Sequence, residues 1–236
     1  MNTPKSFTKA IAAMSLPSTF NPYRDCCPIH DRADAAKVRK RNLMFCLEAA
    51  IEGKVDTMWI ARDLGYRGGR RTGVALTDEI HLAEAAALYG GAALERATKG
   101  PLVAERTASV VWSLLTQIRQ PVMLWNVFPF HPHEADDPLS NRCHTRAERE
   151  ATWPLFLTLI EMLQPKRIVA IGKDAAAALE GIDIPVSTVR HPSYGGQTEF
   201  IAGVEQIYGF TNKRQPTRTA EPELPIIYGS TAATAA

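Results

Sequence analysis

Three polar side chains that could carry out hydrolysis stand at or just after the ends of short apolar runs. They are Asp63, Asn126 and His191. A carboxylate can orient a water molecule or stabilise a cation, an amide offers a donor and an acceptor side by side, and an imidazole can donate a hydrogen bond. Ligands of open parallel α/β sheets bind beyond the carboxyl ends of the strands. We therefore expect these three residues to share one crevice.

A basic, glycine-rich segment follows Asp63. Residues 65–73 read Gly-Tyr-Arg-Gly-Gly-Arg-Arg-Thr-Gly, and their glycines lack the GxGxxG spacing of a dinucleotide-binding loop. Glycines allow a backbone to approach a phosphate closely, and arginines supply positive charge. The segment is predicted to be a loop, and a nucleic-acid strand fits it better than a small nucleotide does.

Alternating strands and helices must position these residues. Apolar runs predict strands at 55–61, 121–127, 167–171 and 186–189. Helical patterns and caps predict helices at 31–53, 78–97, 105–118, 145–163 and 175–179. The basic residues of the first helix are expected to face solvent, and they are Lys37, Arg39, Lys40 and Arg41. The alternation predicts an α/β fold of three layers, α/β/α, with a central, mostly parallel four-stranded sheet.

Composition limits the class of protein. The 236 residues are 45% hydrophobic and carry a formal net charge of +2, which fits one globular domain and does not by itself indicate a polyanion partner. We expect a single domain over residues 1–212 and a polar, flexible tail over 213–236. No apolar stretch is long enough to cross a bilayer or to act as a secretory signal, so a soluble, cytoplasmic monomer is expected.

Cysteine and histidine spacing gives little support for a metal. Cys26 and Cys27 are adjacent and have no matching pair for an iron-sulfur cluster. Another group of possible zinc ligands matches no standard spacing, and it comprises His131, His133, Cys143 and His144. The prediction is that the protein has no metal and no other cofactor.

The order of the motifs resembles that of the uracil-DNA glycosylase superfamily. That family has a catalytic motif after its first strand, a base-reading asparagine after a later one, and a His-Pro-Ser loop that presses into DNA. In this chain the corresponding segments look like residues 61–73, Asn126 with the downstream residues 140–142, and residues 191–193. The resemblance extends from about residue 55 to residue 203 and implies the fold of that family.

The resemblance also implies an activity. The protein would be a hydrolase, a monofunctional DNA glycosylase that flips a base out of double- or single-stranded DNA and hydrolyses its N-glycosidic bond. His191 would donate to a base oxygen, Asp63 would orient water or stabilise the sugar cation, and Asn126 would read the base edge. The implied base-binding residues are Gly65, Tyr66, Leu76 and Asn126. The implied DNA-binding residues are Arg67, Gly68, Arg70, Arg71, Asn141, Arg142, Ser193, Tyr194 and Gly195.

Each proposed role has a structural alternative. Asn126 could tie down a loop, His191 could be a structural histidine before a proline, and Asp63 could pair with Arg70 or Arg71. The chain also departs from the family pattern. Leu64 stands where a proline is usual, and Leu76 stands where a phenylalanine usually stacks on the base.

Gly65 affects the choice of substrate. It stands where uracil-specific relatives carry a tyrosine that blocks the C5 side of the pyrimidine, so we expect that side of the pocket to be open. Uracil or a 5-modified pyrimidine, such as a hypermodified cytosine of phage DNA, would then be the substrate. Antiviral defence and DNA repair both fit this activity. The alternatives are a non-catalytic DNA-binding protein on the same fold and a small-nucleotide enzyme.

Overall fold

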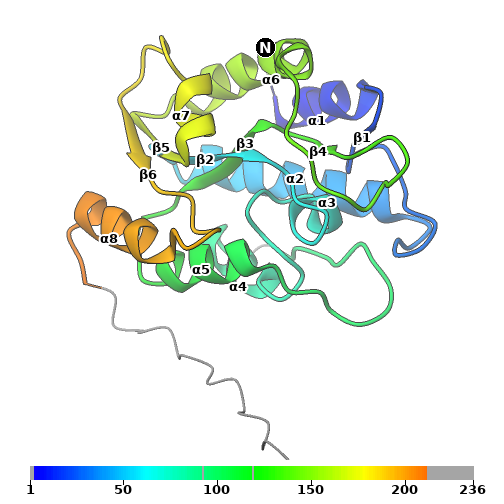
Figure 1. Cartoon of the computed structure of the whole chain (residues 1–236), viewed down its shortest axis with the longest axis horizontal. Coiled ribbons are helices and arrows are strands. Elements are labelled where there is room, and N and C mark those ends of the chain that lie inside the picture. The colour runs from blue at the N-terminus through cyan, green and yellow to red at the C-terminus, as the bar shows by residue number, and fades with distance from the viewer. Residues whose placement is uncertain (1–2, 92, 119, 212–236) are drawn as a thin grey trace, which may run out of the picture.

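A four-stranded parallel sheet forms the centre of the protein (Figure 1). The computed structural model describes residues 3–91, 93–118 and 120–211, so the predicted tail lies outside the described residues. The spatial order of the strands is β3-β2-β5-β6, and every neighbouring pair is parallel. The strands are β2 (Thr57–Asp63), β3 (Met123–Phe128), β5 (Arg167–Ile171) and β6 (Val186–Val189). The predicted α/β class and its four strands are confirmed.

Helices cover both faces of this sheet, because alternate side chains of each strand point to opposite sides. Met58 and Ile60 of β2 belong to one buried cluster, and Trp59 and Ala61 belong to the other. The helices that pack on the first cluster are α1 (Pro4–Ala13), α2 (Ala35–Glu52), α6 (Arg146–Leu163) and α7 (Lys173–Ala178). Those on the second are α4 (Leu82–Leu88), α5 (Arg106–Leu115) and α8 (Gln197–Tyr208). Figure 1 shows α6 and α7 above the sheet and α5 and α8 below it.

Some elements were not anticipated from the sequence. Helix α1 begins with a capping box between Thr3 and Ser6, and its Phe7 packs against Trp125 of β3. A two-stranded antiparallel ribbon joins β1 (Thr19–Phe20) to β4 (His131–Pro132). Two residues are too few to give a sequence pattern, so tertiary packing decides this pairing. In the described part of the chain, no helix has the length and apolar character needed to cross a membrane.

The prediction of one long helix over residues 78–97 is wrong. Among the described residues of that range, α4 is the only helix, and it ends before Gly90 and Gly91, which both have a positive φ. Before α4, the side chains of Asp78 and Glu79 accept hydrogen bonds from backbone N–H groups of the segment that leads into α5, at Glu105 and Val103. Side-chain bonds to the backbone of this kind compete with helix formation.

The segment after β2 also differs from the prediction of a plain loop. Residues Gly69–Thr72 form the short helix α3, which ends at Gly73 with a positive φ. A Cβ at Gly73 would collide with the backbone and side chain of Arg39, so this close approach requires a glycine. The segment is therefore packed against α2.

Arg39 is the largest departure from the predicted helix 31–53. Its side chain is 0% exposed, whereas the sequence pattern placed it on the solvent face. It forms an ion pair of 2.8 Å with Asp31 and donates to the carbonyl oxygens of Pro22 and Asp25. A buried cation needs such partners, because desolvation of an unpaired charge is costly.

Replacement of Arg39 by methionine is expected to lower the free energy of unfolding by about 3–5 kcal/mol, because Asp31 would remain buried without its cation. The matched change Lys37→Met removes an exposed cation from the same helix and should alter stability by less than about 0.5 kcal/mol. Urea unfolding followed by circular dichroism measures both. Similar small losses in the two variants would show that the pair does not support the fold.

Candidate active site

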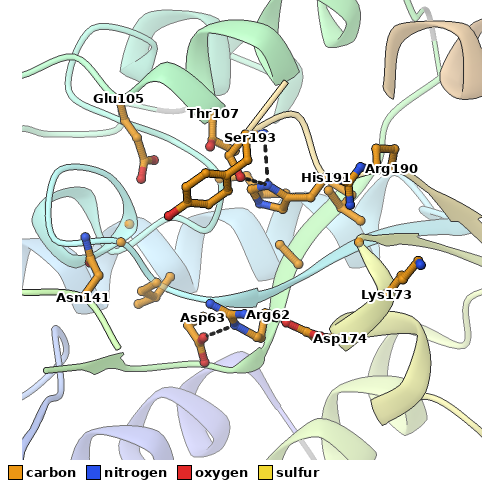
Figure 2. A pocket seen from close by; sticks show the side chains of 18 of the residues that line it. Arg62, Asp63, Glu105, Thr107, Asn141, Lys173, Asp174, Arg190, His191 and Ser193 are labelled. Atoms are coloured by element: carbon orange, nitrogen blue, oxygen red, sulfur yellow. Dashed lines mark hydrogen bonds and ion pairs between the residues drawn. The ribbon is translucent and has the colours of Figure 1, made fainter. Parts of the chain in front are cut away.

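A pocket of about 410 Å³ opens at the carboxyl ends of β2, β5 and β6. Its wall includes Asp63 after β2, Lys173 after β5 and His191 after β6, together with Glu105 at the start of α5. Figure 2 shows Glu105 and Asn141 on one side of the view and Lys173 and Arg190 on the other, with His191 between them. Two of the three residues singled out from the sequence, Asp63 and His191, thus line one pocket.

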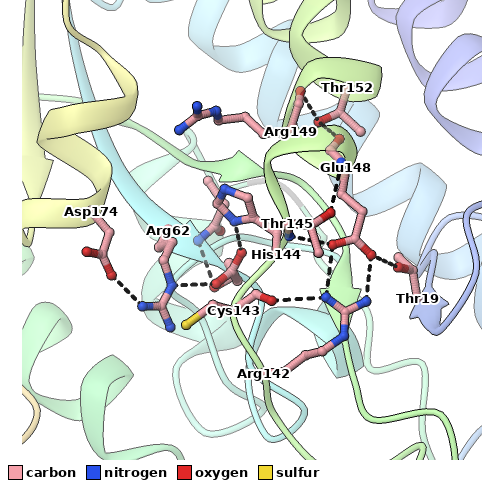
Figure 3. A network of polar contacts seen from close by, with 12 residues as sticks. Thr19, Arg62, Arg142, Cys143, His144, Thr145, Glu148, Arg149, Thr152 and Asp174 are labelled. Atoms are coloured by element: carbon pink, nitrogen blue, oxygen red, sulfur yellow. Dashed lines mark hydrogen bonds and ion pairs between the residues drawn. The ribbon is translucent and has the colours of Figure 1, made fainter.

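Asp63 is the last residue of β2, and its side chain is 7% exposed. Arg62 Nε donates to one carboxylate oxygen at 2.6 Å, and His144 Nδ1 bonds to the other. Arg62 is paired in turn with Asp174 at the start of α7. The partners of Asp63 are therefore Arg62 and His144, not Arg70 or Arg71. Both carboxylate oxygens are fixed in direction, and Figure 3 shows the Arg62 and His144 side of this network.

His191 is held in one orientation by the turn that follows it. The backbone N–H of Ser193 donates to His191 Nδ1 at 3.2 Å, and the Ser193 hydroxyl lies 2.7 Å from the same atom. Because Nδ1 accepts, the neutral ring carries its proton on Nε2. Burial, with the positive charges of Arg62 and Arg190, lowers the pKa of His191 and favours this neutral form. The ring packs over Gly172, where a side chain would crowd it.

Asn126 does not line this pocket, although the sequence predicted that it would share the crevice. It is buried within β3 opposite Ala61, and its Nδ2 donates to the backbone oxygen of Asp63 at 2.9 Å. Its Oδ1 is buried with no hydrogen-bond partner in the described part of the structure. This geometry agrees with the loop-tying alternative, and a role in reading the base stays a prediction.

Glu105 fills the space beside Gly65 that the sequence led us to expect to be empty. A Cβ at Gly65 or at Gly68 would collide with one of the two carboxylate oxygens of Glu105. Burial and the nearby Asp78 raise the pKa of Glu105 to about 7. The expectation of an open side is thus corrected. Only its place as the first residue of a predicted helix distinguished Glu105 in the sequence.

Leu76 and Leu64 form part of the apolar wall of the pocket. Leu76 has a φ of +55°, which is strained for a residue with a side chain, and it lies among buried neighbours that hold it there. Tyr66, predicted to bind the base, is not on the pocket wall. Its backbone N–H donates to Asn141 Oδ1, and its ring lies under the guanidinium of Arg67.

Arg70 and Arg71 are not surface residues, and the prediction that they contact DNA is wrong for the structure described. Each is 5% exposed. The guanidinium of Arg70 lies 4.2 Å from the centre of the Phe20 ring, and burial lowers its pKa. Arg71 forms an ion pair with Glu79. These cations stabilise the segment after β2 from within.

Arg142 is also committed to a structural network (Figure 3). Its guanidinium donates twice to Glu148 and once each to the backbone oxygens of Ser18, His133 and Cys143. These five bonds use all five N–H groups of the side chain. Arg142 touches the pocket, but it has no N–H left for a phosphate unless this network rearranges.

Other predicted DNA contacts are accessible. Arg67 is exposed on the segment after β2, although Gly68 beside it is buried. Ser193 lines the pocket, and Tyr194 and Gly195 both have a positive φ in the exposed turn after His191. The Tyr194 side chain is 97% exposed, an unusual position for a large aromatic residue.

The histidines considered as zinc ligands have other partners. His131 Nε2 lies 2.7 Å from the Ser140 carbonyl oxygen, His133 bonds to the Glu134 carbonyl oxygen, and His144 bonds to Asp63. Burial and the charge of Arg70 lower the pKa of His131 to about 3. No three His, Cys, Asp or Glu residues are grouped to hold a metal ion in residues 3–91, 93–118 and 120–211.

Comparison with known proteins places the fold and the family. The structure is similar to the crystal structure of SMUG2 from Pedobacter heparinus, with a TM-score of 0.57 and 12% sequence identity over 89% of this chain and 97% of that one. A search of curated protein sequences gives no significant match. The model of the uracil-DNA glycosylase superfamily matches residues 66–208, a segment that contains Asn126 and His191 but not Asp63. Because this match covers more than half of the 236 residues, the chain belongs to the uracil-DNA glycosylase superfamily.

Proposed function

We propose that the protein is a monofunctional DNA glycosylase, which takes a base flipped out of DNA into its pocket and hydrolyses the N-glycosidic bond. The observation that carries the proposal is that a neutral, oriented imidazole and a fixed carboxylate, His191 and Asp63, line the same pocket. Water completes the reaction, and the product is an abasic site. The proposed substrate is DNA, bound by a single copy of the chain.

His191 would act on the departing base. Negative charge builds on the base as the glycosidic bond breaks, and a fixed N–H donor stabilises that charge more than it stabilises the intact substrate. A neutral ring whose Nδ1 is occupied presents Nε2–H as this donor. The lowered pKa of His191 supports the same role at neutral pH.

Asp63 would act on the sugar. The transition state of glycoside cleavage resembles an oxocarbenium ion, and a nearby carboxylate stabilises it or orients the attacking water. Arg62 and His144 fix the two carboxylate oxygens, which reduces the reorganisation needed during the reaction. Asn126 would support Asp63 from behind through its backbone oxygen.

Tyr194 and the exposed cations would hold the DNA. Tyr194 protrudes beside His191, where an aromatic ring could fill the gap that a flipped base leaves in the stack. Arg67, Lys173 and Arg190 lie at or near the pocket and could contact phosphates. Two substrates remain candidates for the pocket, namely uracil and a 5-modified pyrimidine such as a hypermodified cytosine of phage DNA. The first would serve repair, and the second would serve antiviral defence.

An alternative is a non-catalytic DNA-binding protein. Two observations favour it: both Asp63 oxygens are engaged, by Arg62 and His144, and leucines stand at positions 64 and 76. One assay separates the two. Oligonucleotides that contain uracil, 5-hydroxymethylcytosine or its glucosylated form are incubated with the protein and then treated with alkali, which cleaves abasic sites. DNA binding without strand breaks on any substrate would rule out the glycosylase.

Asp63→Asn and His191→Ala should each lower kcat by about 10²–10³-fold, with DNA affinity largely retained, because both groups would act mainly in the transition state. Single-turnover cleavage and fluorescence anisotropy measure the two quantities. Asp137→Asn, in an exposed loop, is the matched control and should keep full activity. Near-normal turnover in either site variant would place the chemistry on other residues.

Arg67→Ala should weaken DNA binding equally for all sequences and reduce the slope of log K against log salt by about 1, as expected for one phosphate contact. Lys37→Ala, which removes an exposed cation from α2, is the control and should leave the slope unchanged. Binding titrations at several salt concentrations give the slope. An unchanged slope for Arg67→Ala would remove this residue from the DNA interface.

A further inference from the structure

Glu105 is a pocket residue whose carboxyl group has no structural partner. It stands at the N-cap of α5, yet its side chain makes no capping bond to that helix. Within residues 3–91, 93–118 and 120–211, no hydrogen bond or ion pair to either carboxyl oxygen is found. Its backbone N–H donates to Asp78 Oδ2 at 2.6 Å, which fixes the position of the residue. Two free acceptor atoms therefore face the pocket from a well-held backbone.

The surroundings of Glu105 make room for this carboxyl group. Gly65 and Gly68 lie directly under its two oxygens, and a side chain at either glycine would occupy their place. Thr107 and Asn141 also line the pocket (Figure 2). A polar group that is partly removed from water without a partner costs stability, so a ligand that supplies a donor would relieve that cost.

We propose that Glu105 determines which base is cut, by accepting a hydrogen bond from the exocyclic amino group of a cytosine-type base. The proposal rests on the function proposed above. Cytosine presents an amino donor at position 4, whereas thymine and uracil present an oxygen acceptor there. An ionised carboxylate only accepts hydrogen bonds, so it favours the amino group and repels the oxygen.

His191, which lines the same pocket, has the complementary polarity. His191 would present a donor and Glu105 an acceptor, so a base with an acceptor at one edge and a donor at another suits both. A cytosine ring has this arrangement in its 2-oxo and 4-amino groups, and a uracil ring carries oxygen acceptors at both positions. The pocket therefore selects a base by its pattern of hydrogen-bond donors and acceptors, and not only by the size of its 5-substituent.

The protonation state of Glu105 gives the proposal a signature. Its pKa is raised to about 7 by burial and by Asp78, which is itself held ionised by bonds to His81 and to the Glu105 backbone. Below pH 7 a protonated carboxyl can both donate and accept, and so it tolerates either base. Above pH 7 the ionised form only accepts. Selectivity for the 4-amino base should thus rise with pH. Selectivity is measured as the ratio of kcat/KM for the two substrates. Effects that act equally on both substrates, such as those of His191, therefore cancel.

The test compares 5-hydroxymethylcytosine with 5-hydroxymethyluracil in otherwise identical oligonucleotides, because the two bases differ at position 4. The wild-type protein should show a kcat/KM ratio of at least about tenfold in favour of the cytosine form at pH 8, and a smaller ratio at pH 6. Glu105→Gln, whose amide can donate or accept, should reduce the ratio to within about threefold and remove its pH dependence. Gly65→Ala should also reduce it, because the added methyl group displaces the carboxyl group.

Glu52→Gln is the matched control. This exposed glutamate ends α2 just before β2, at the end of the sheet opposite to the pocket, and its variant should keep the wild-type ratio. If the wild-type protein cuts DNA and Glu105→Gln keeps the same ratio and pH dependence, the inference fails while the glycosylase stands. If the wild-type protein cuts neither of these bases, nor uracil or glucosylated 5-hydroxymethylcytosine, the proposed function fails, and the same oligonucleotides then test the inference by binding. Equal ratios of Kd for wild type and Glu105→Gln would overturn it.

Discussion

Three buried arginines support the segment after β2, which contributes Leu64, Gly65, Gly69 and Leu76 to the pocket wall. Arg39 pairs with Asp31 under Gly73, Arg70 lies on Phe20, and Arg71 pairs with Glu79. A cation removed from water must find an anion, a ring or carbonyl oxygens, and each such partner is a fixed point for the chain. Because these points come from α2, β1 and the segment before α4, the path after β2 depends on the fold around it. The positions of the pocket residues in this segment therefore depend on these contacts.

The same contacts distinguish the carboxylates that stabilise the fold from those that line the pocket. Glu79 accepts bonds from Thr98 and Val103 as well as pairing with Arg71, and Asp78 holds the backbone of Glu105. Asp78 and Glu79 are therefore fully engaged with partners, whereas no partner is found for the Glu105 carboxyl group in the part of the chain that the structure describes. Asp63 is likewise held by Arg62 and His144, but it remains on the pocket wall. A site that is built in this way has few groups that must reorganise when charge develops, which is what electrostatic catalysis requires.

The sequence predicted the strands well because β2, β3 and β5 are short apolar runs buried on both faces, as Met58 and Trp59 illustrate on opposite sides of β2. It also placed Asp63 and His191 at the carboxyl ends of strands of one parallel sheet, β2 and β6. It failed where tertiary contacts override local pattern. Arg39 has the spacing of a solvent-facing residue, but it is buried and pairs with Asp31, which lies 8 residues earlier in the sequence. Glu105 lies beside Gly65 although the two residues are far apart in the sequence, so no local sequence pattern predicts the contact.

The glycines after β2 illustrate why one sequence pattern can support two structures. A glycine in a basic segment indicates that something approaches the backbone closely, and a phosphate is the usual candidate. Here the approaching groups are protein side chains, because Glu105 lies over Gly65 and Gly68 and Arg39 lies over Gly73. Arg70 and Arg71 of the segment then turn inward, Arg70 onto the Phe20 ring and Arg71 toward the Glu79 carboxylate, whereas Arg67 stays exposed. Thus the pattern correctly indicated close approach, but its cause was internal packing, and the pocket gained an acidic wall where an open one was expected.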